Sequence, residues 1–249
     1  MSARVLALLV VLPLSAWADC ASWSWKVFPA PGTTVPTNAR FVLQAYGMAQ
    51  PVVASIATRH PRLVTQDGSQ FPLKVLEVNV GEFQLTQAVL QPKGALTEGT
   101  RYTLRFDQPE GPERFSLPRD ESASWIVGPA DFEPPVWATS PSAQPGKIVQ
   151  YGCGPLVEAR VAVALTSAEP VQFRARVSRP DGGVREFLLA PEKGDIAIGH
   201  GMCSGAFEPG EGAWSLELTA VDLAGNATRA PGPALRFKGV ESVDRPDGG

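Results

Sequence analysis

The segment of this 249-residue chain that most suggests chemistry is GMCSG at residues 201–205, which follows His200. Its G-x-C-x-G spacing matches a nucleophile elbow, in which a strand leads into a strained turn and a helix follows. The next seven residues, AFEPGEG, contain one proline and two glycines, which disfavour that helix. We therefore expect Cys203 to lie in a structural loop, and a thiol-dependent hydrolase is the less favoured alternative.

The sequence offers few candidates for a catalytic base. The chain has two histidines, His60 and His200, and His60 lies beside Pro61 in the other half of the chain. Few residues are therefore available to form a Cys-His or Ser-His catalytic pair. We expect no catalytic residues and classify the chain as non-enzymatic.

The first eighteen residues have the pattern of a secretory signal peptide. Arg4 gives a positive start, residues 5–14 are a short apolar run, and the small residues Ala16 and Ala18 precede the expected cleavage before Asp19. The apolar run is about ten residues, whereas a membrane-spanning helix needs about twenty. We expect export to the periplasm or the cell surface, with no transmembrane segment after removal of the leader.

Three cysteines, Cys20, Cys153 and Cys203, are present. In an oxidising compartment two of them are expected to form a disulfide, and Cys153 with Cys203 is the natural pair because both lie beside glycines in the second half. Cys20 is then left free, paired between chains, or in competition for one of the other two. Lipidation of Cys20 is disfavoured because the preceding Asp19 is charged.

The sequence favours neither a metal nor a cofactor. Its histidines and cysteines lack the paired short spacings of a zinc site. Asp181, Asp222 and Asn226 lie in expected turns and could bind calcium, but such side chains usually bond their own backbone. The net charge of −3 comes without a basic cluster, which argues against nucleic-acid binding.

Four tryptophans are candidate ligand-facing aromatics: Trp23, Trp25, Trp125 and Trp137. They lie at expected domain starts or in an expected linker, whereas Trp214 alternates with leucines and is expected in the core. Exposed aromatic rings bind sugars or proteins, yet tryptophans near a domain junction more often seal an interface. We favour the sealing role.

From residue 23 onward, short runs of alternating apolar and polar residues are broken by proline, glycine, asparagine or aspartate, which indicates β-strands. No helix is expected between them. Asp67-Gly68 and Pro180-Asp181-Gly182-Gly183 are expected hairpin turns. The expected strands cover residues 24–28, 39–46, 52–58, 71–78, 82–90, 100–106, 113–117, 156–166, 171–177, 184–189, 214–220 and 234–238.

These strands divide into two groups around a proline-rich segment. We predict a signal peptide at 1–18, a first domain at 19–122, a linker at 123–132, a second domain at 133–239 and a disordered tail at 240–249. Seven strands in the first group suffice for one sandwich.

Three segments carry a family resemblance. FPAPGTTVPTN at residues 28–38 and LTEGTRYTLRF at residues 96–106 resemble parts of bacterial Ig-like domains. AVDLAGN at residues 220–226 resembles the strand-end turn of Ig-like and fibronectin-type repeats of bacterial surface proteins. The resemblance implies an all-β fold of two tandem Ig-like antiparallel β-sandwich domains, and it brings no fixed catalytic residues.

From these observations we expect an exported, non-enzymatic protein with a structural, adhesive or protein-binding role. Its partner is expected to be an unidentified envelope protein or polysaccharide. The alternative is a carbohydrate-binding module that uses the exposed tryptophans.

Overall fold

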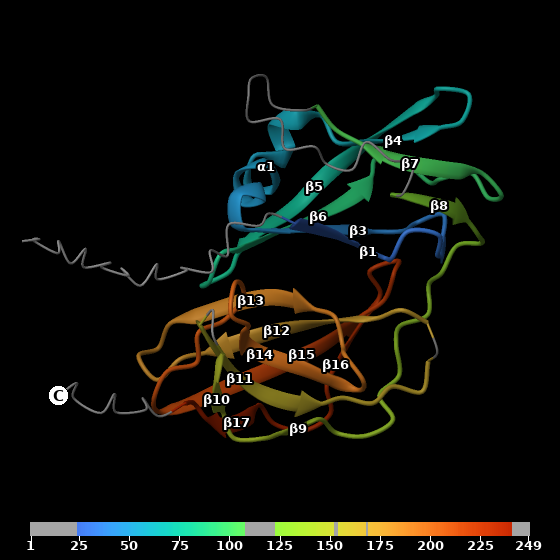
Figure 1. Ribbon diagram of the computed structural model, residues 1–249. Coiled ribbons are helices and arrows are strands. Elements are labelled where there is room, and N and C mark those ends of the chain that lie inside the picture. Colours follow the sequence, from blue (N-terminus) through green and yellow to red (C-terminus); the bar gives the residue numbers. More distant parts are fainter. Residues whose placement is uncertain (1–23, 108–122, 152–153, 168, 241–249) are drawn as a thin grey trace, which may run out of the picture.

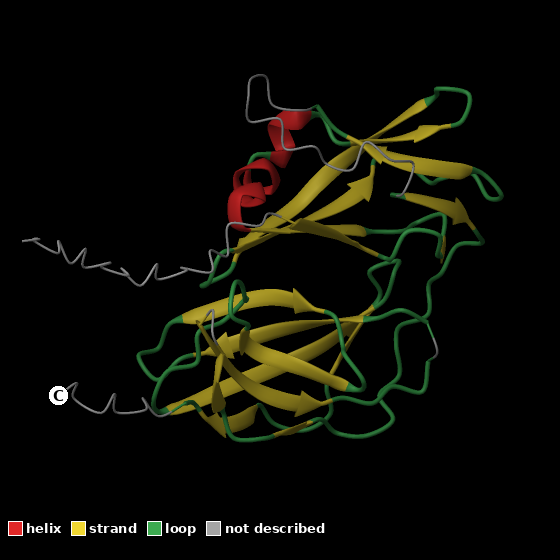
Figure 2. Ribbon diagram, viewed as in Figure 1, coloured by secondary structure: helices red, strands yellow, loops and turns green. Residues whose placement is uncertain are grey.

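The structure is a computed structural model that describes residues 24–107, 123–151, 154–167 and 169–240 (Figure 1). Within these residues the chain is all-β, with one short α-helix and two 3₁₀ segments (Figure 2). Several predictions fall outside the described residues: the signal peptide, Cys20, Trp23, the strand at 113–117, Cys153 and residues 241–249.

Residues 24–127, here called the N-terminal half, form one eight-stranded sheet among the described residues. The strand order is β1-β3-β6-β5-β4-β7-β8-β2. The strands are β1 (Ser24–Phe28), β2 (Thr34–Val35), β3 (Phe41–Tyr46), β4 (Arg62–Thr65), β5 (Gln70–Val80), β6 (Leu85–Pro92), β7 (Arg101–Arg105) and β8 (Ser124–Val127).

The long strand β5 joins the two parts of this sheet. Its first residues pair with β4, with Arg62 opposite Pro72, and its later residues pair with β6. The register shifts between Val75 and Glu77, so the strand carries an irregularity of the kind that bends a sheet. The sheet thereby curves around a core that includes Phe41, Leu43, Leu90 and Trp125.

The expected strand at residues 52–58 is wrong, because this segment is helical. The segment contains α1 (Gln50–Ala54), flanked by the 3₁₀ segments η1 (Gly47–Ala49) and η2 (Ile56–Arg59). Pro51 lies in the first turn of α1. A backbone N–H at that position would have no acceptor within the helix, so proline costs no helical hydrogen bond there. Val52, Val53 and Ile56 are all buried in the core, which the near-helical spacing of these apolar residues permits.

The expected linker at 123–132 also needs correction. Its first residues form β8, which pairs antiparallel with β7, with Tyr102 opposite Trp125, and parallel with β2. Trp125 is fully buried and its Nε1 donates to Pro29 O at 3.0 Å. Residues 124–127, which were predicted to lie in a linker because of the surrounding prolines, are therefore part of the N-terminal sheet.

Residues 142–238, here called the C-terminal half, form two sheets that face each other across a second core (Figure 2). One sheet has the order β10-β11-β14 with β9 beside β11, and the other has the order β13-β12-β15-β16 with β17 beside β15. The strands are β9 (Ser142–Ala143), β10 (Lys147–Tyr151), β11 (Gly154–Ala162), β12 (Gln172–Ser178), β13 (Val184–Leu189), β14 (Asp195–His200), β15 (Ala213–Val221), β16 (Ala227–Arg229) and β17 (Leu235–Lys238).

Two sequence patterns in this half are confirmed. Trp214, Leu216 and Leu218 are buried along β15 while the residues between them are partly exposed. The turn at residues 179–183 joins β12 and β13, with the Arg179 N–H donating to Gly183 O at 2.8 Å. Among the described residues, none of the helical segments has the length and apolar character that a membrane crossing requires.

Candidate functional site

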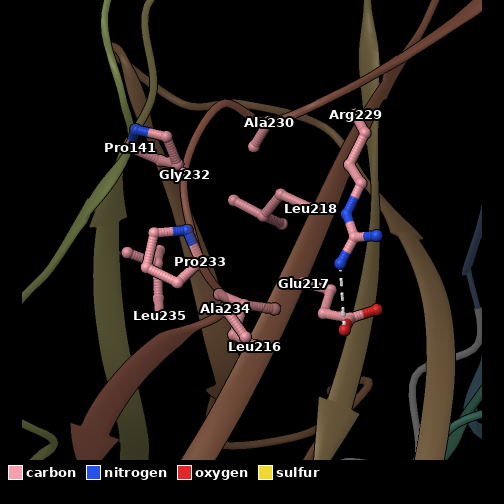
Figure 3. Close-up of a pocket in the computed structure, with 10 residues that line it drawn as sticks. All are labelled: Pro141, Leu216, Glu217, Leu218, Arg229, Ala230, Gly232, Pro233, Ala234 and Leu235. Carbon is pink, nitrogen blue, oxygen red and sulfur yellow. Dashed lines mark ion pairs between the residues drawn. The ribbon is translucent and has the colours of Figure 1, made fainter.

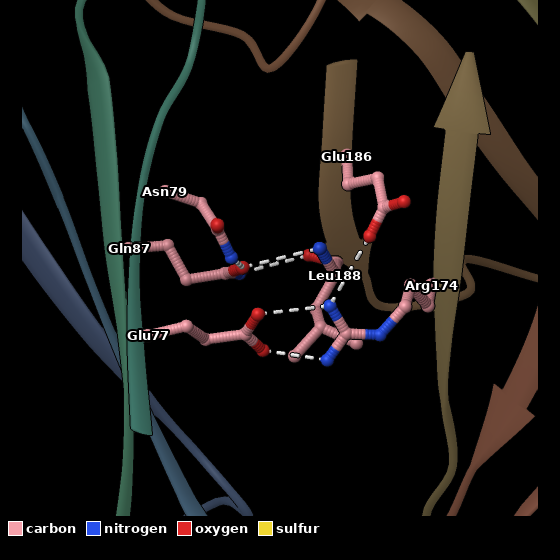
Figure 4. A network of polar contacts seen from close by, with 6 residues as sticks. All are labelled: Glu77, Asn79, Gln87, Arg174, Glu186 and Leu188. Carbon is pink, nitrogen blue, oxygen red and sulfur yellow. Dashed lines mark hydrogen bonds and ion pairs between the residues drawn. The ribbon is translucent and has the colours of Figure 1, made fainter. Parts of the chain in front are cut away.

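The two halves meet along β6 and β13, and a buried glutamine lies at the centre of this contact (Figure 4). The Gln87 side-chain Nε2 donates to Leu188 O at 2.9 Å, and the Leu188 N–H donates to Gln87 Oε1 at 3.1 Å. Gln87 is fully buried, so both of these bonds form away from water. Because β13 is the last strand in its sheet order, Gln87 occupies the position that a further strand would take.

Beside this pair, Glu77 and Arg174 form a two-pronged ion pair across the same interface (Figure 4). Arg174 donates through both terminal nitrogens, one of them at 2.9 Å from Glu77 Oε2. The hydrogen bond to Glu77 raises the pKa of Arg174 above its ordinary value, so the guanidinium stays charged. Glu186 on β13 lies 3.7 Å from the same guanidinium.

At one end of the interface, the β5–β6 turn docks on the GMCSG loop. The Phe83 N–H donates to Gly205 O at 3.2 Å, and the Gly205 N–H donates to Phe83 O at 2.7 Å. A Cβ atom at Gly205 would lie 2.2 Å from the Cα of His200, so this close approach requires glycine. The Glu82 carboxylate pairs with Arg179 and accepts the Glu208 N–H at 2.7 Å.

The motif at 201–205 thus has a packing role in the structure. His200 is buried, its Nδ1 is 2.8 Å from Gly201 O, and its ring lies against that of Phe83 with 4.4 Å between centroids. His60 lies in the N-terminal half, where its Nδ1 is 2.8 Å from Asp107 Oδ2. The predicted Cys153–Cys203 bridge stays a prediction, because Cys153 lies outside the described residues.

At the other end of the interface, the segment after β8 is bonded to both halves. Asn38 donates its Nδ2 to Asp131 O at 2.6 Å and accepts the Asp131 N–H at 3.2 Å. From the turn after β15, Asn226 donates its Nδ2 to the same carbonyl oxygen at 3.3 Å. The Arg40 N–H donates to Leu223 O at 2.7 Å, and the Leu223 side chain packs into the N-terminal core.

Three carboxylates meet at this end. Asp131, Glu169 and Asp222 each place a carboxylate oxygen within 4.8 Å of the other two. Burial raises the pKa of Asp222, and burial followed by the charges of Asp131 and Asp222 raises the pKa of Glu169. The turn that holds Asp222 was predicted, and its Oδ1 accepts the Asn226 N–H at 2.8 Å. Asp181 instead bonds its own turn, at 2.9 Å from the Gly183 N–H.

The three candidate tryptophans that the structure describes, Trp25, Trp125 and Trp137, are not gathered into one surface. Trp125 is fully buried, so this candidate does not face a ligand. Trp25 is partly buried and packs against the N-terminal core, while Trp137 packs on Phe173 and donates its Nε1 to Thr228 O at 3.1 Å. Trp137 therefore contributes to the C-terminal core, and the sealing role at the junction stays a prediction.

A pocket beside β15 is lined largely by aliphatic groups (Figure 3). Leu216, Leu218 and Pro233 are among its lining residues. Its charged lining residues among those described, Glu217 and Arg229, pair with each other at 3.1 Å. Because their charges are already matched, the described lining of this pocket presents no unpaired charged group to a ligand.

Sequence reasoning missed most of the residues that join the halves. Gln87, Glu77 and Arg174 lie in strands that were predicted, but their partners come from the other half of the chain. Asp131 and Glu169 lie in irregular segments without a motif. Of the carboxylate cluster, the sequence drew attention to Asp222 alone, through its turn.

Comparison with known proteins yields limited similarity. No protein-family model matches the chain, and no curated protein matches it in sequence. Among solved structures, the chain is similar to a pullulanase from Anoxybacillus sp. LM18-11 (6% identity, 81% of this chain and 24% of that chain, TM-score 0.24). It is also similar to the FN1-FN3 domains of chicken CNTN1 (10% identity, 86% of this chain and 67% of that chain, TM-score 0.29). A third similar structure is a tetra-tandem repeat in the extending region of a large adhesion protein (12% identity, 88% of this chain and 50% of that chain, TM-score 0.24).

The chain spans about a quarter of the pullulanase and half of the adhesion-protein structure. TM-scores at this level assign neither a family nor a function, so the function has to be argued from the chain's own geometry.

Proposed function

We propose that this chain is an exported, non-enzymatic module of two tandem Ig-like β-sandwiches that act as one rigid unit. Its role is structural, adhesive or protein-binding, in the periplasm or at the cell surface. The leader-like pattern of the first eighteen residues supports export. The two facing sheets of the C-terminal half and the curved sheet of the N-terminal half each enclose a core, which supports the Ig-like sandwich interpretation.

The observation that carries the proposal is that the halves are joined at three separate places. Gln87 bonds Leu188 at the centre, Phe83 bonds Gly205 at one end, and the Arg40 N–H donates to Leu223 O at the other. Each core also receives one leucine from the opposite half, Leu223 in the N-terminal core and Leu85 in the C-terminal core. Contacts spread along an interface in this way resist hinge motion, because bending at any one contact breaks another.

A rigid pair of sandwiches suits the display of a composite binding surface. Enzyme active sites need a nucleophile or an acid–base pair held in reach of a substrate. Here the two histidines are in different halves, and both have hydrogen-bonding neighbours. The polar side chains that converge between the halves instead serve to hold the halves together.

The test is capture of a partner by the full chain from the envelope fraction of its source organism, followed by titration of the purified pair. We expect saturable binding of one envelope protein without chemical change in it. Gln87→Leu, which loosens the interface, should weaken this binding, and the matched control Gln66→Leu in the exposed β4–β5 turn should leave it unchanged.

Two results would contradict the proposal. One is turnover of a substrate by the purified chain. The other is saturable quenching of tryptophan fluorescence by an envelope polysaccharide without any protein partner, which would favour the carbohydrate-binding alternative.

A further inference from the structure

The carboxylate cluster at the end of the interface is drawn from three segments far apart in the sequence. Asp131 follows β8, Glu169 lies in the loop between β11 and β12, and Asp222 directly follows β15. One oxygen of each lies within 4.8 Å of the others, which is close enough for a single cation to contact all three. Asn38 and Asn226 hold the Asp131 backbone in this position.

The second observation is an unpartnered oxygen on one of the three carboxylates, that of Asp222. Asp222 is 3% exposed. Its Oδ1 accepts the Asn226 N–H at 2.8 Å, whereas its Oδ2 is buried and has no hydrogen-bond partner among the described residues. A buried carboxylate oxygen normally has a donor or a cation beside it, because leaving it bare is costly.

Among the described residues, neighbouring side chains do not supply that positive charge. Among the ion pairs between described residues, none brings a lysine, arginine or histidine nitrogen within 4.0 Å of Asp131, Glu169 or Asp222. The nearby Arg40 packs its guanidinium against Gly225 in the turn that follows Asp222. Three carboxylates therefore face one another without a paired side-chain cation from the part of the chain that the structure describes.

We propose that Asp131, Glu169 and Asp222 bind one calcium ion at the junction between the two halves. Carboxylate oxygens are hard ligands, and the cluster contains neither the imidazole nor the thiolate that zinc and copper prefer. Calcium accepts six to eight oxygen ligands in flexible geometry, so three side chains can be completed by water and backbone carbonyl oxygens. Magnesium is less suited because it demands near-ideal octahedral geometry.

Such an ion would connect the segment after β8 with two loops of the C-terminal half. Asp131 is already bonded to Asn38 of the N-terminal half, so the ion would add a cross-link at the junction. The inference does not depend on the proposed binding function, because it concerns the carboxylates alone.

The experiment is isothermal titration of calcium chloride into the EGTA-treated and desalted full chain at neutral pH, paired with thermal unfolding. We expect one calcium ion per chain, with a dissociation constant in the range of about 10⁻⁴ to 10⁻³ M that extracellular modules show. Calcium should also raise the unfolding temperature. Magnesium at the same concentration should have a smaller effect.

Matched variants locate the site. Asp222→Asn and Glu169→Gln should each weaken calcium binding roughly tenfold or more. Asp222→Asn keeps a side-chain oxygen that can accept the Asn226 N–H, and Glu169 is only partly buried, so both variants should fold, which circular dichroism checks. The control Asp181→Asn, in the β12–β13 turn, should bind calcium as the wild type does.

Two outcomes would overturn the proposal. The first is wild-type protein that neither binds calcium nor gains thermal stability from it, which would mean that protons relieve the repulsion between the carboxylates. The second is calcium binding that persists unchanged in both Asp222→Asn and Glu169→Gln. A failed search for a protein partner would leave this result untouched, so the two proposals fail separately.

Discussion

The side-chain amide of Gln87 bonds both backbone polar groups of Leu188, its Nε2 at 2.9 Å from the carbonyl oxygen and its Oε1 at 3.1 Å from the nitrogen. Leu188 lies on β13, the last strand in its sheet order, where unpaired backbone groups would otherwise face outward. One side chain of the N-terminal half thus takes the place of a strand at the edge of a C-terminal sheet.

Replacing Gln87 with leucine should be strongly destabilising. It leaves the N–H and C=O of Leu188 buried without partners, at a cost of about 2–4 kcal/mol in the free energy of unfolding. Gln66→Leu, at an exposed turn position, should change stability by less than about 0.5 kcal/mol. Urea denaturation of the two variants measures the difference, and equal stability would show that the Gln87 contact contributes little.

Glycine at position 205 should be required for the docking of the β5–β6 turn. In Gly205→Ala the new methyl group would lie 2.2 Å from the Cα of His200, and backbone atoms there have little room to shift. We expect a loss of about 2 kcal/mol or more in the free energy of unfolding. Gly210→Ala is the control, because a Cβ atom there meets nothing within 4 Å. A stable Gly205→Ala variant would argue against this close approach.

The Glu77–Arg174 pair should show measurable coupling. Both side chains are more than a quarter exposed, so solvent screening limits the coupling in a double-mutant cycle to about 1 kcal/mol. The cycle uses Glu77→Ala, Arg174→Ala and the double variant, each unfolded in urea. Coupling should decrease in high salt. A coupling energy of zero at low salt would mean that the contact is not maintained in solution.

The carboxylate cluster predicts a pH dependence when calcium is removed. The pKa values of Asp222 and Glu169 are raised on folding, so the folded state holds protons that the unfolded state releases. Their contribution to stability therefore falls as the pH rises above the ordinary values of 3.8 and 4.5. In EGTA, Asp222→Asn and Glu169→Gln should gain stability relative to the wild type as the pH rises. A difference that is constant across this range would contradict the prediction.

Local patterns in the sequence predicted local structure well. The alternation around Trp214, Leu216 and Leu218 predicts β15 because one face of a strand must be apolar when it covers a core. The Pro180-Asp181-Gly182-Gly183 turn is predicted for a similarly local reason, because glycine readily adopts the positive φ that a tight hairpin turn needs. In the structure Gly182 has a φ of 86°. Both features depend on neighbours within a few residues.

The errors arise where local patterns are ambiguous or where partners are distant. Val52, Val53 and Ile56 fit a buried strand as well as a short helix, and packing against the core decides for the helix. Trp125 lies in a proline-rich region, so the pairing of β8 with β7 was not visible. Asp131, Glu169 and Asp222 converge only after both halves have folded, which no local spacing indicates.

The central claim is that the two halves form one rigid unit, and backbone ¹⁵N relaxation of the full chain tests it most directly. Rotational correlation times are fitted separately for amides of residues 24–127 and residues 142–238. The account predicts one shared correlation time and one diffusion tensor for both sets in the wild type. The correlation times of the two sets should differ in Gln87→Leu but not in Gln66→Leu. Distinct, shorter correlation times for the two halves of the wild type would contradict it.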